Sequence, residues 1–132
     1  MPRYPADYTP EELGKLFRQA WTENVIRHHP DSPPQAYIIP WAKTVQWERD
    51  TAISTAHTII DLIHRSNHNT HKLTPQEQSQ LLTATWNANV HNHHPDPGPH
   101  HTTPWTELPT WRKTGNTTIF NTLQTWATSE EP

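Results

Sequence analysis

Cysteine is absent from this 132-residue chain, which excludes both a disulfide framework and a thiolate metal site. Only three glycines are present, and they form no glycine loop of the kind that cradles phosphate. No apolar run is long enough to cross a bilayer, and the first residues, Met1-Pro2-Arg3-Tyr4-Pro5, lack the apolar core of a signal peptide. These absences predict an intracellular protein located in the cytoplasm.

An excess of positive charge is also missing. Ten lysines and arginines against thirteen acidic residues give a net charge of −3 with histidines neutral. A protein that binds duplex nucleic acid needs a basic face to neutralise phosphates, and here the basic residues are scattered. The eleven histidines would add positive charge only below about pH 6.5. We therefore expect neither nucleic acid nor a membrane among the partners at neutral pH.

Apolar residues are scarce as well, at 31% of the chain with a mean hydropathy of −0.95. Seven tryptophans offset this scarcity, because one indole ring can bury up to ~250 Å². We expect a core with few residues and much aromatic area, in a single domain spanning 1–132.

The sequence contains two copies of one pattern. W-T-E-N-V-I-R-H-H-P-D begins at Trp21, and W-N-A-N-V-H-N-H-H-P-D begins at Trp86. Each copy continues through a proline-rich stretch to a Pro-Trp pair, at 40–41 and at 104–105, and a further tryptophan follows six residues later. An internal repeat of this length predicts one structural unit used twice. We place the repeats at 9–66 and 74–128, with a linker at 67–73.

Both copies begin with a helix-start signal, T-P-E-E from Thr9 and T-P-Q-E from Thr74, which predicts a capping box with proline in the first turn. Apolar residues at steps of three and four predict a helix after each signal and a second helix from about residues 44 and 110. Gly115-Asn116 weakens the fourth helix, and prolines predict extended, stiff loops between the helices. We predict an all-α fold of two tandem helix–loop–helix repeats, with proline-rich loops within each repeat. Neither repeat has enough apolar surface to stand alone, so they should pack about a pseudo-two-fold axis.

The Pro-Trp segments resemble a known family. Pro40-Trp41, Trp47, Arg49 and Ala52-Ile53 resemble the P-W-x-x-x-P-x-W-x-R-x-x-A-I signature of ryanodine-receptor-type (RyR) domains, which occur in prokaryotic and phage proteins. In the second copy, P-W-T-E-L-P-T-W at 104–111 is similar to the family's P-W-x-E-L-P-x-W form. The resemblance covers residues 9–128 in tandem.

This chain departs from the family pattern at several positions. Val45 stands in place of a proline, Lys113 in place of an arginine and Asn116-Thr117 in place of Ala-Ile, and the family's G-W-x-Y-G segment is missing. The resemblance implies a binding module, because paired RyR domains of large eukaryotic channels look like adenine-nucleotide sites and prokaryotic copies are proposed to sense nucleotide-derived signals. A phage copy, acting in the host cytoplasm, could sequester a defence messenger.

Two matching sets of side chains are the candidate ligand site: Trp21, Asn24 and His28, and Trp86, Asn89 and His93. Spacings of three and four place each set on one helical face. The indoles would stack a planar base, and the asparagine amides would read an adenine edge. The alternative is that the tryptophans belong to the core and that each Asn–His pair is a helix-end hydrogen bond.

Arg27, Arg49, Arg112 and Lys113 are candidate phosphate contacts, because guanidinium groups make paired bonds to phosphate oxygens. The leading arrangement uses Arg27, Arg49 or Lys113, and the alternative for each is a solvated surface charge. The remaining tryptophans of the Pro-Trp segments are predicted to wedge the loops against the helices: Trp41, Trp47, Trp105 and Trp111.

Histidines suggest a metal hypothesis in two places: His64, His68 and His71, and the group His91, His93, His94, His100 and His101. A structural zinc site needs four ligands with supporting hydrogen bonds, and cysteine is absent. We therefore predict neither a metal nor a cofactor, and zinc storage or sensing stays as a further hypothesis.

Catalysis has little support, because the chain shows no nucleophile in a recognisable turn and no paired carboxylates on an inner helical face. We predict a non-enzymatic protein that binds a nucleotide-derived signalling molecule, with homo-oligomerisation left open. The main alternative is a structural or protein–protein interaction module whose tryptophans serve only for packing. The third hypothesis is metal storage or sensing by the histidines, and a histidine-based hydrolase of a nucleotide messenger stays open beside it.

Overall fold

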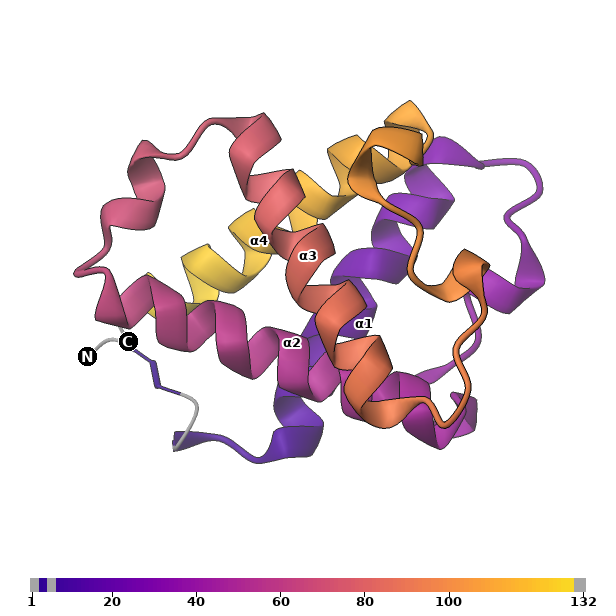
Figure 1. Ribbon diagram of the computed structural model, residues 1–132, viewed down its shortest axis with the longest axis horizontal. Coiled ribbons are helices and arrows are strands. Elements are labelled where there is room, and N and C mark those ends of the chain that lie inside the picture. The colour runs from indigo at the N-terminus through magenta and orange to yellow at the C-terminus, as the bar shows by residue number, and fades with distance from the viewer. Residues whose placement is uncertain (1–2, 5–6, 130–132) are drawn as a thin grey trace.

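The computed structural model describes residues 3–4 and 7–129, and in these residues it contains four α-helices, short 3₁₀ turns and no strand. The helices are α1 (Pro10–His28), α2 (Gln46–Arg65), α3 (Pro75–His93) and α4 (Thr110–Thr128) (Figure 1). The all-α prediction is confirmed. None of the described helices combines the length and the apolarity that a bilayer crossing requires.

The capping boxes form as the sequence predicts. The Oγ1 atom of Thr9 accepts a hydrogen bond from the backbone N–H of Glu12 at 3.2 Å, and Thr74 accepts one from Glu77 at 3.1 Å. In return, each glutamate carboxylate accepts a hydrogen bond from the N–H of its threonine. These bonds satisfy N–H groups that the first turn of a helix leaves without partners.

The two proline-rich connections are not extended throughout, because each folds into two 3₁₀ turns. The first contains η2 (Gln35–Tyr37) and η3 (Trp41–Lys43), and the second contains η5 (Pro99–His101) and η6 (Trp105–Glu107). Proline sits immediately before or at the start of each turn, where its fixed φ suits a helical turn and its missing N–H costs nothing. Residues 10–65 and 75–128 therefore share one order of elements, helix, turn, turn, helix.

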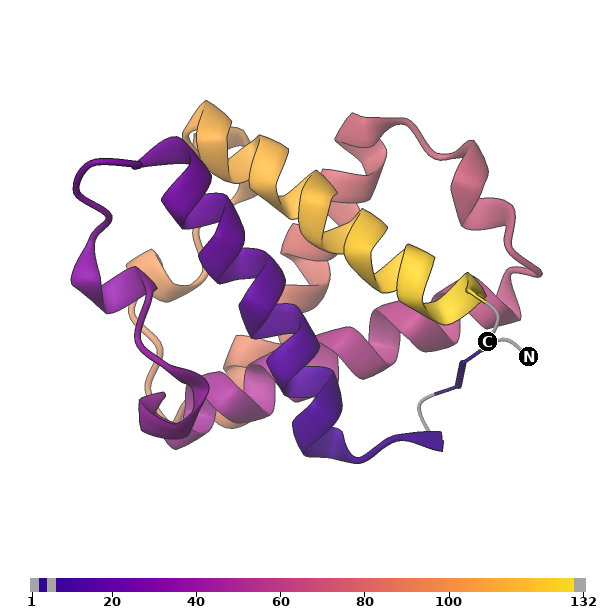
Figure 2. The ribbon, with the colours of Figure 1, turned by 180° about the vertical axis from the view of Figure 1, so that it is seen from behind.

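Both connections lie at the same end of the molecule, and the segment that joins α2 to α3 lies at the other end (Figures 1 and 2). That segment contains η4 (Asn69–Lys72), which is docked on α4 because Thr70 Oγ1 donates to Gln124 Oε1 at 2.6 Å. The polar linker predicted at 67–73 is thus partly buried against the helices.

The helices enclose a core of mostly aliphatic side chains together with Phe17 and Phe120. α1 and α3 each pack on both α2 and α4, and α2 also contacts α4. The largest fully buried side chains include Phe120, Ile59, Ile60, Leu82 and Leu123. All seven tryptophans are only half-buried, so the indole area expected inside the core lies instead around its edge. Indole rings are large and carry an N–H that needs a partner, which favours this position.

Gly115 and Asn116 do not break α4, because both make buried contacts. Gly115 lies directly against the side chain of Asn24 in α1, which leaves no room for a Cβ atom. Asn116 Nδ2 donates to Thr83 Oγ1 of α3 at 2.8 Å. Close packing of α4 against its neighbours therefore outweighs the weak helix propensity of this pair.

Candidate functional site

A cavity of about 380 Å³ lies between the helices and the two proline-rich connections. We call it the central cavity. Its lining residues come from α1 (Phe17, Arg18, Trp21), the first connection (Ala36, Tyr37, Trp41, Thr44), α2 (Trp47, Glu48, Ala52), α3 (Leu82, Thr83, Trp86, Asn87), the second connection (His100, His101, Thr103, Leu108) and α4 (Arg112, Asn116, Ile119). All four helices and both connections therefore contribute to one site.

Aromatic rings form much of the wall. Trp21 Nε1 donates to the carbonyl oxygen of Tyr37 at 2.9 Å, and the two rings meet edge to face with centroids 5.6 Å apart. Phe17 stacks on Trp86, with centroids 5.4 Å apart and an interplanar angle of 12°. Phe17 and Trp21 are four residues apart on α1, so helical spacing brings both to the same face. The half-buried indoles present apolar ring surface to the cavity.

The tryptophans of the Pro-Trp pairs hold the connections against the helices. Trp41 lies on Gly14 of α1, and its Nε1 donates to Glu11 Oε1 at 2.7 Å. Trp105 Nε1 donates to Ser79 Oγ of α3 at 2.7 Å. These contacts fit the predicted wedge role, and Trp41 also lines the central cavity.

An ion pair lies on the side of the cavity formed by α1 and α2. Arg18 Nη1 is 3.2 Å from Glu48 Oε1, and its Nε and Nη2 atoms donate to the carbonyl oxygen of Ile39. Burial lowers the pKa of Arg18, and the charge of Glu48 opposes that shift. Arg18 is therefore fully engaged. The sequence patterns did not single out this arginine, although it lies three residues before Trp21 on the same helical face.

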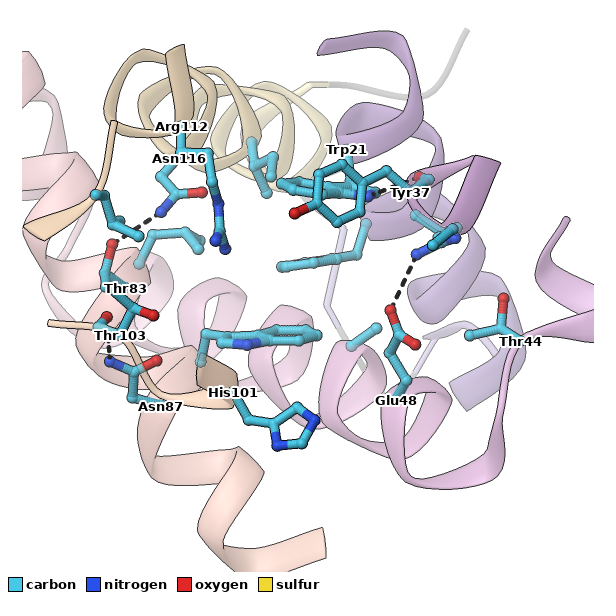
Figure 3. Close-up of a pocket in the computed structure, with 18 of the residues that line it drawn as sticks. Trp21, Tyr37, Thr44, Glu48, Thr83, Asn87, His101, Thr103, Arg112 and Asn116 are labelled. Carbon is cyan, nitrogen blue, oxygen red and sulfur yellow. Dashed lines mark hydrogen bonds and ion pairs between the residues drawn. The ribbon is translucent and has the colours of Figure 1, made fainter. Parts of the chain in front are cut away.

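Arg112 extends from α4 into the cavity on the side opposite Glu48, with Trp21 and Tyr37 along one wall and His101 along the other (Figure 3). Its guanidinium carbon lies 5.4 Å from the ring centroid of Trp21, within the range of a cation–π contact. Burial lowers the pKa of Arg112, and Tyr37 opposes that shift. Its Nε atom is buried and has no hydrogen-bond partner among the described residues.

Two asparagines place amide groups at the cavity. Asn87 Nδ2 donates to the carbonyl oxygen of Thr103 at 3.2 Å, and Asn116 Nδ2 donates to Thr83 as described above. Neither Oδ1 atom accepts a hydrogen bond from any described residue. Both asparagines therefore offer an acceptor to a ligand while their amide nitrogens hold them in place.

Histidines cluster at the second connection beside Trp47. The rings of His94 and His101 have centroids 4.6 Å apart, those of His100 and His101 are 3.9 Å apart, and Trp47 meets His94 edge to face at 4.6 Å. His101 Nδ1 accepts a hydrogen bond from the backbone N–H of Gly98 at 3.0 Å. Burial, and then the neighbouring His100 and His94, lower the pKa of His101. A neutral imidazole at the cavity wall follows at neutral pH.

No group of three or more His, Asp or Glu side chains in the described part of the chain is placed to hold a metal ion. Of the first predicted group, His64 stacks on Tyr4 with centroids 4.0 Å apart and bonds the carbonyl oxygen of Arg3 through Nε2 at 2.7 Å. The His64 and His68 rings are 5.5 Å apart, and His71 is exposed.

Of the predicted ligand residues, the structure brings Trp21 and Trp86 together in the central cavity. Asn24 and Asn89, which the sequence placed on the same helical faces as these tryptophans, are not among the residues that line the cavity. Asn24 is only 1% exposed, and its Nδ2 donates to the carbonyl oxygen of Trp111 at 3.5 Å. Asn89 Nδ2 donates within α3 to the carbonyl oxygen of Thr85 at 3.1 Å.

The predicted histidines and cations are also placed elsewhere. His93 Nε2 bonds Ser54 Oγ at 2.8 Å, and His28 is exposed near Trp111. Arg27 is exposed, Arg49 donates to Gln46 Oε1 at 2.7 Å, and Lys113 lies 4.4 Å from the ring centroid of Trp105. Of the four candidate phosphate contacts, Arg112 is the one that lines the central cavity.

Comparisons of this chain with protein-family models, with curated proteins and with solved structures found no match.

Proposed function

We propose that this protein is a non-enzymatic binding protein that takes up a small planar ligand of nucleotide type in the central cavity. The observation that carries the proposal is an aromatic-walled cavity of about 380 Å³ with one unpaired guanidinium among its lining residues. Ligand pockets are typically ~300–1,000 Å³, mostly apolar, with a few polar groups that fix orientation. The alternative, an interaction module with tryptophans used only for packing, predicts a filled groove at this place.

Stacking supplies the affinity in this proposal. Trp21 and Trp86 each expose ring surface to the cavity, and a base stacked on an indole gains roughly 1–3 kcal/mol. The Oδ1 acceptors of Asn87 and Asn116 suit the amino group of an adenine. The sequence-based roles of Asn24, Asn89, His28, His93, Arg27, Arg49 and Lys113 as ligand contacts stay predictions.

The proposal includes two tandem repeats of RyR-like type, related by a pseudo-two-fold axis. Two features support it. The order of elements is the same in residues 10–65 and 75–128, and residues from both stretches line one cavity. Sequestration of a nucleotide messenger in the cytoplasm, as by a phage protein, is the biological role that would follow.

Calorimetric titration tests the proposal with a panel of mononucleotides and cyclic nucleotides. We expect at least one of them to bind the wild-type protein, and Trp86→Ala to weaken that binding about tenfold through the lost stack. Trp126→Ala is the matched control, since Trp126 is also half-buried but lies outside the central cavity. Well-folded protein that gives no binding heat with any member of the panel would refute the proposal.

A further inference from the structure

Among the described residues that line the central cavity, Arg112 is the charged side chain without a counter-ion. Its buried Nε atom has no partner, and none of its nitrogens bonds a described residue. The Trp21 ring beside it offsets only part of the hydration that this half-buried guanidinium loses on folding. Natural sequences tolerate such local conflicts chiefly at functional sites.

Comparison of the two halves of the chain shows why Arg112 is unpaired. Glu48 is the third residue of α2, and Arg112 is the third residue of α4. Glu48 meets Arg18, the ninth residue of α1. The ninth residue of α3 is Thr83, which bonds Asn116 and offers no carboxylate. The first half therefore closes its ion pair, whereas the second half leaves a cation facing the cavity.

We propose that the ligand is a planar aromatic compound with one acidic group, and that Arg112 binds this group while the ring lies against Trp21 and Trp86. This inference rests on the function proposed above. The planar guanidinium fits a phosphate or a carboxylate equally well, because it makes paired N–H bonds to two oxygens of either group.

The charges also favour one orientation. Glu48 lies opposite Arg112 across the cavity (Figure 3) and is already paired with Arg18, so the unpaired cation available to an acidic group is at the Arg112 side. A cavity of about 380 Å³ is near the lower end of the usual range for ligand pockets, which suits one base with one phosphate. A symmetric cyclic dinucleotide carries two phosphates, whereas the cavity lining offers one unpaired guanidinium. The expected ligand therefore has a single acidic group and no two-fold symmetry.

Calorimetric titration of matched probes tests this inference. The probes are adenosine, adenosine monophosphate and cyclic di-adenosine monophosphate, together with indole and indole-3-acetate. We expect the wild-type protein to bind at least one acidic probe roughly tenfold or more tightly than its neutral counterpart, as charge-assisted hydrogen bonds do. If adenosine monophosphate binds more tightly than adenosine, the acidic group is a phosphate. If indole-3-acetate binds more tightly than indole, it is a carboxylate.

Arg112→Gln should abolish this preference while leaving the affinity for the neutral ring similar. Arg65→Gln removes the same charge from an exposed site on α2 that pairs with Asp61, and it should retain the preference. The inference is overturned if Arg112→Gln keeps the preference, if Arg49→Gln removes it instead, or if the cyclic dinucleotide binds most tightly. A third outcome concerns the wild-type protein. If adenosine and its monophosphate have equal affinities, and indole and indole-3-acetate do too, this inference is overturned but the proposed function stands. No binding of any probe would overturn both.

The stability of the free protein gives a second readout that needs no ligand. Because the Arg112 guanidinium has neither an ion-pair nor a hydrogen-bond partner in the described structure and only the Trp21 ring beside it, Arg112→Gln should change the Tm of the free protein by no more than about 5 °C. A larger fall in Tm would mean that the guanidinium is a main support of the fold, and the assignment to a ligand would then be wrong.

Discussion

Replacing Gly115 with alanine tests the contact between α1 and α4, which places Trp21 beside Arg112. Gly115 is buried, and a Cβ atom at this position would overlap the side chain of Asn24, with the Asn24 Cγ atom only 2.7 Å away. Asn24 is 1% exposed and therefore cannot turn into solvent. The added methyl group must move either Asn24 or the helix.

Two opposing effects set the magnitude. Overpacking of a filled contact costs about 1–3 kcal/mol, whereas alanine is about 1 kcal/mol more favourable than glycine within a helix. Gly115→Ala alone should therefore destabilise the protein by about 0–2 kcal/mol. In an Asn24→Ala background the methyl group fills vacated space, and the same change should stabilise by about 1 kcal/mol. The expected coupling between the two sites is about 1–3 kcal/mol.

Urea denaturation of the four proteins of this double-mutant cycle measures the coupling, since a domain of this size should unfold in one transition. Gly14→Ala is the internal control. Its Cβ atom would meet Trp41 and Ile53 and not Asn24, so Asn24→Ala should leave its cost unchanged. A coupling below about 0.5 kcal/mol between Asn24 and Gly115 would refute the α1–α4 contact and, with it, the placement of Trp21 beside Arg112.

Three further predictions concern the core, a helix cap and pH. Phe120→Ala should lower the free energy of unfolding by about 3–5 kcal/mol in urea titration, because this ring is 0% exposed; a loss below about 1 kcal/mol would contradict its burial. Thr74→Ala should cost about 1 kcal/mol through the lost cap of α3, while Thr74→Ser should retain most of the stability. The pKa of His101 lies below its ordinary value of 6.5, so the unfolded chain takes up this proton first as the pH falls. Stability should therefore decrease below about pH 6.5 and should do so less steeply in His101→Gln; equal slopes in thermal melts would refute this role.

Local signals predicted the helices well because they depend on neighbours in sequence. Thr9 and Thr74 cap their helices through residues three positions ahead, and α1 and α3 each end two residues before a proline. The continuity of α4 through Gly115 could not be predicted in this way. Its cause is the contact with Asn24, which lies in a different helix. A glycine read by propensity alone looks like a break, whereas here it permits close approach.

The candidate site was predictable only in part, because it too depends on contacts between different helices. Trp21 and Asn24 share one face of α1, and the buried face of a helix spans ≳ 100° around its axis. A face of that width allows Trp21 to line the cavity while Asn24 packs against α4. Arg18 shares the face of Trp21, but its ion pair is with Glu48. Glu48 lies on α2, beyond the first connection, so the spacing within α1 does not predict this pair. Sequence spacing defines a face, and tertiary packing decides what that face meets.

Arg112 and Lys113 show what decides between equally plausible cations. They are adjacent in sequence, so their side chains leave α4 about 100° apart, and only one of them can face the cavity. The packing of Gly115 against Asn24 and of Asn116 against Thr83 sets the rotation of α4, and that rotation directs Arg112 inward and Lys113 toward Trp105. Trp21 and Trp86 occupy equivalent positions in the two copies of the sequence pattern, so this shared pair cannot orient a ligand. Orientation must come from the positions where the copies differ, and those that involve a charge at the cavity are Glu48 against Arg112 and Arg18 against Thr83.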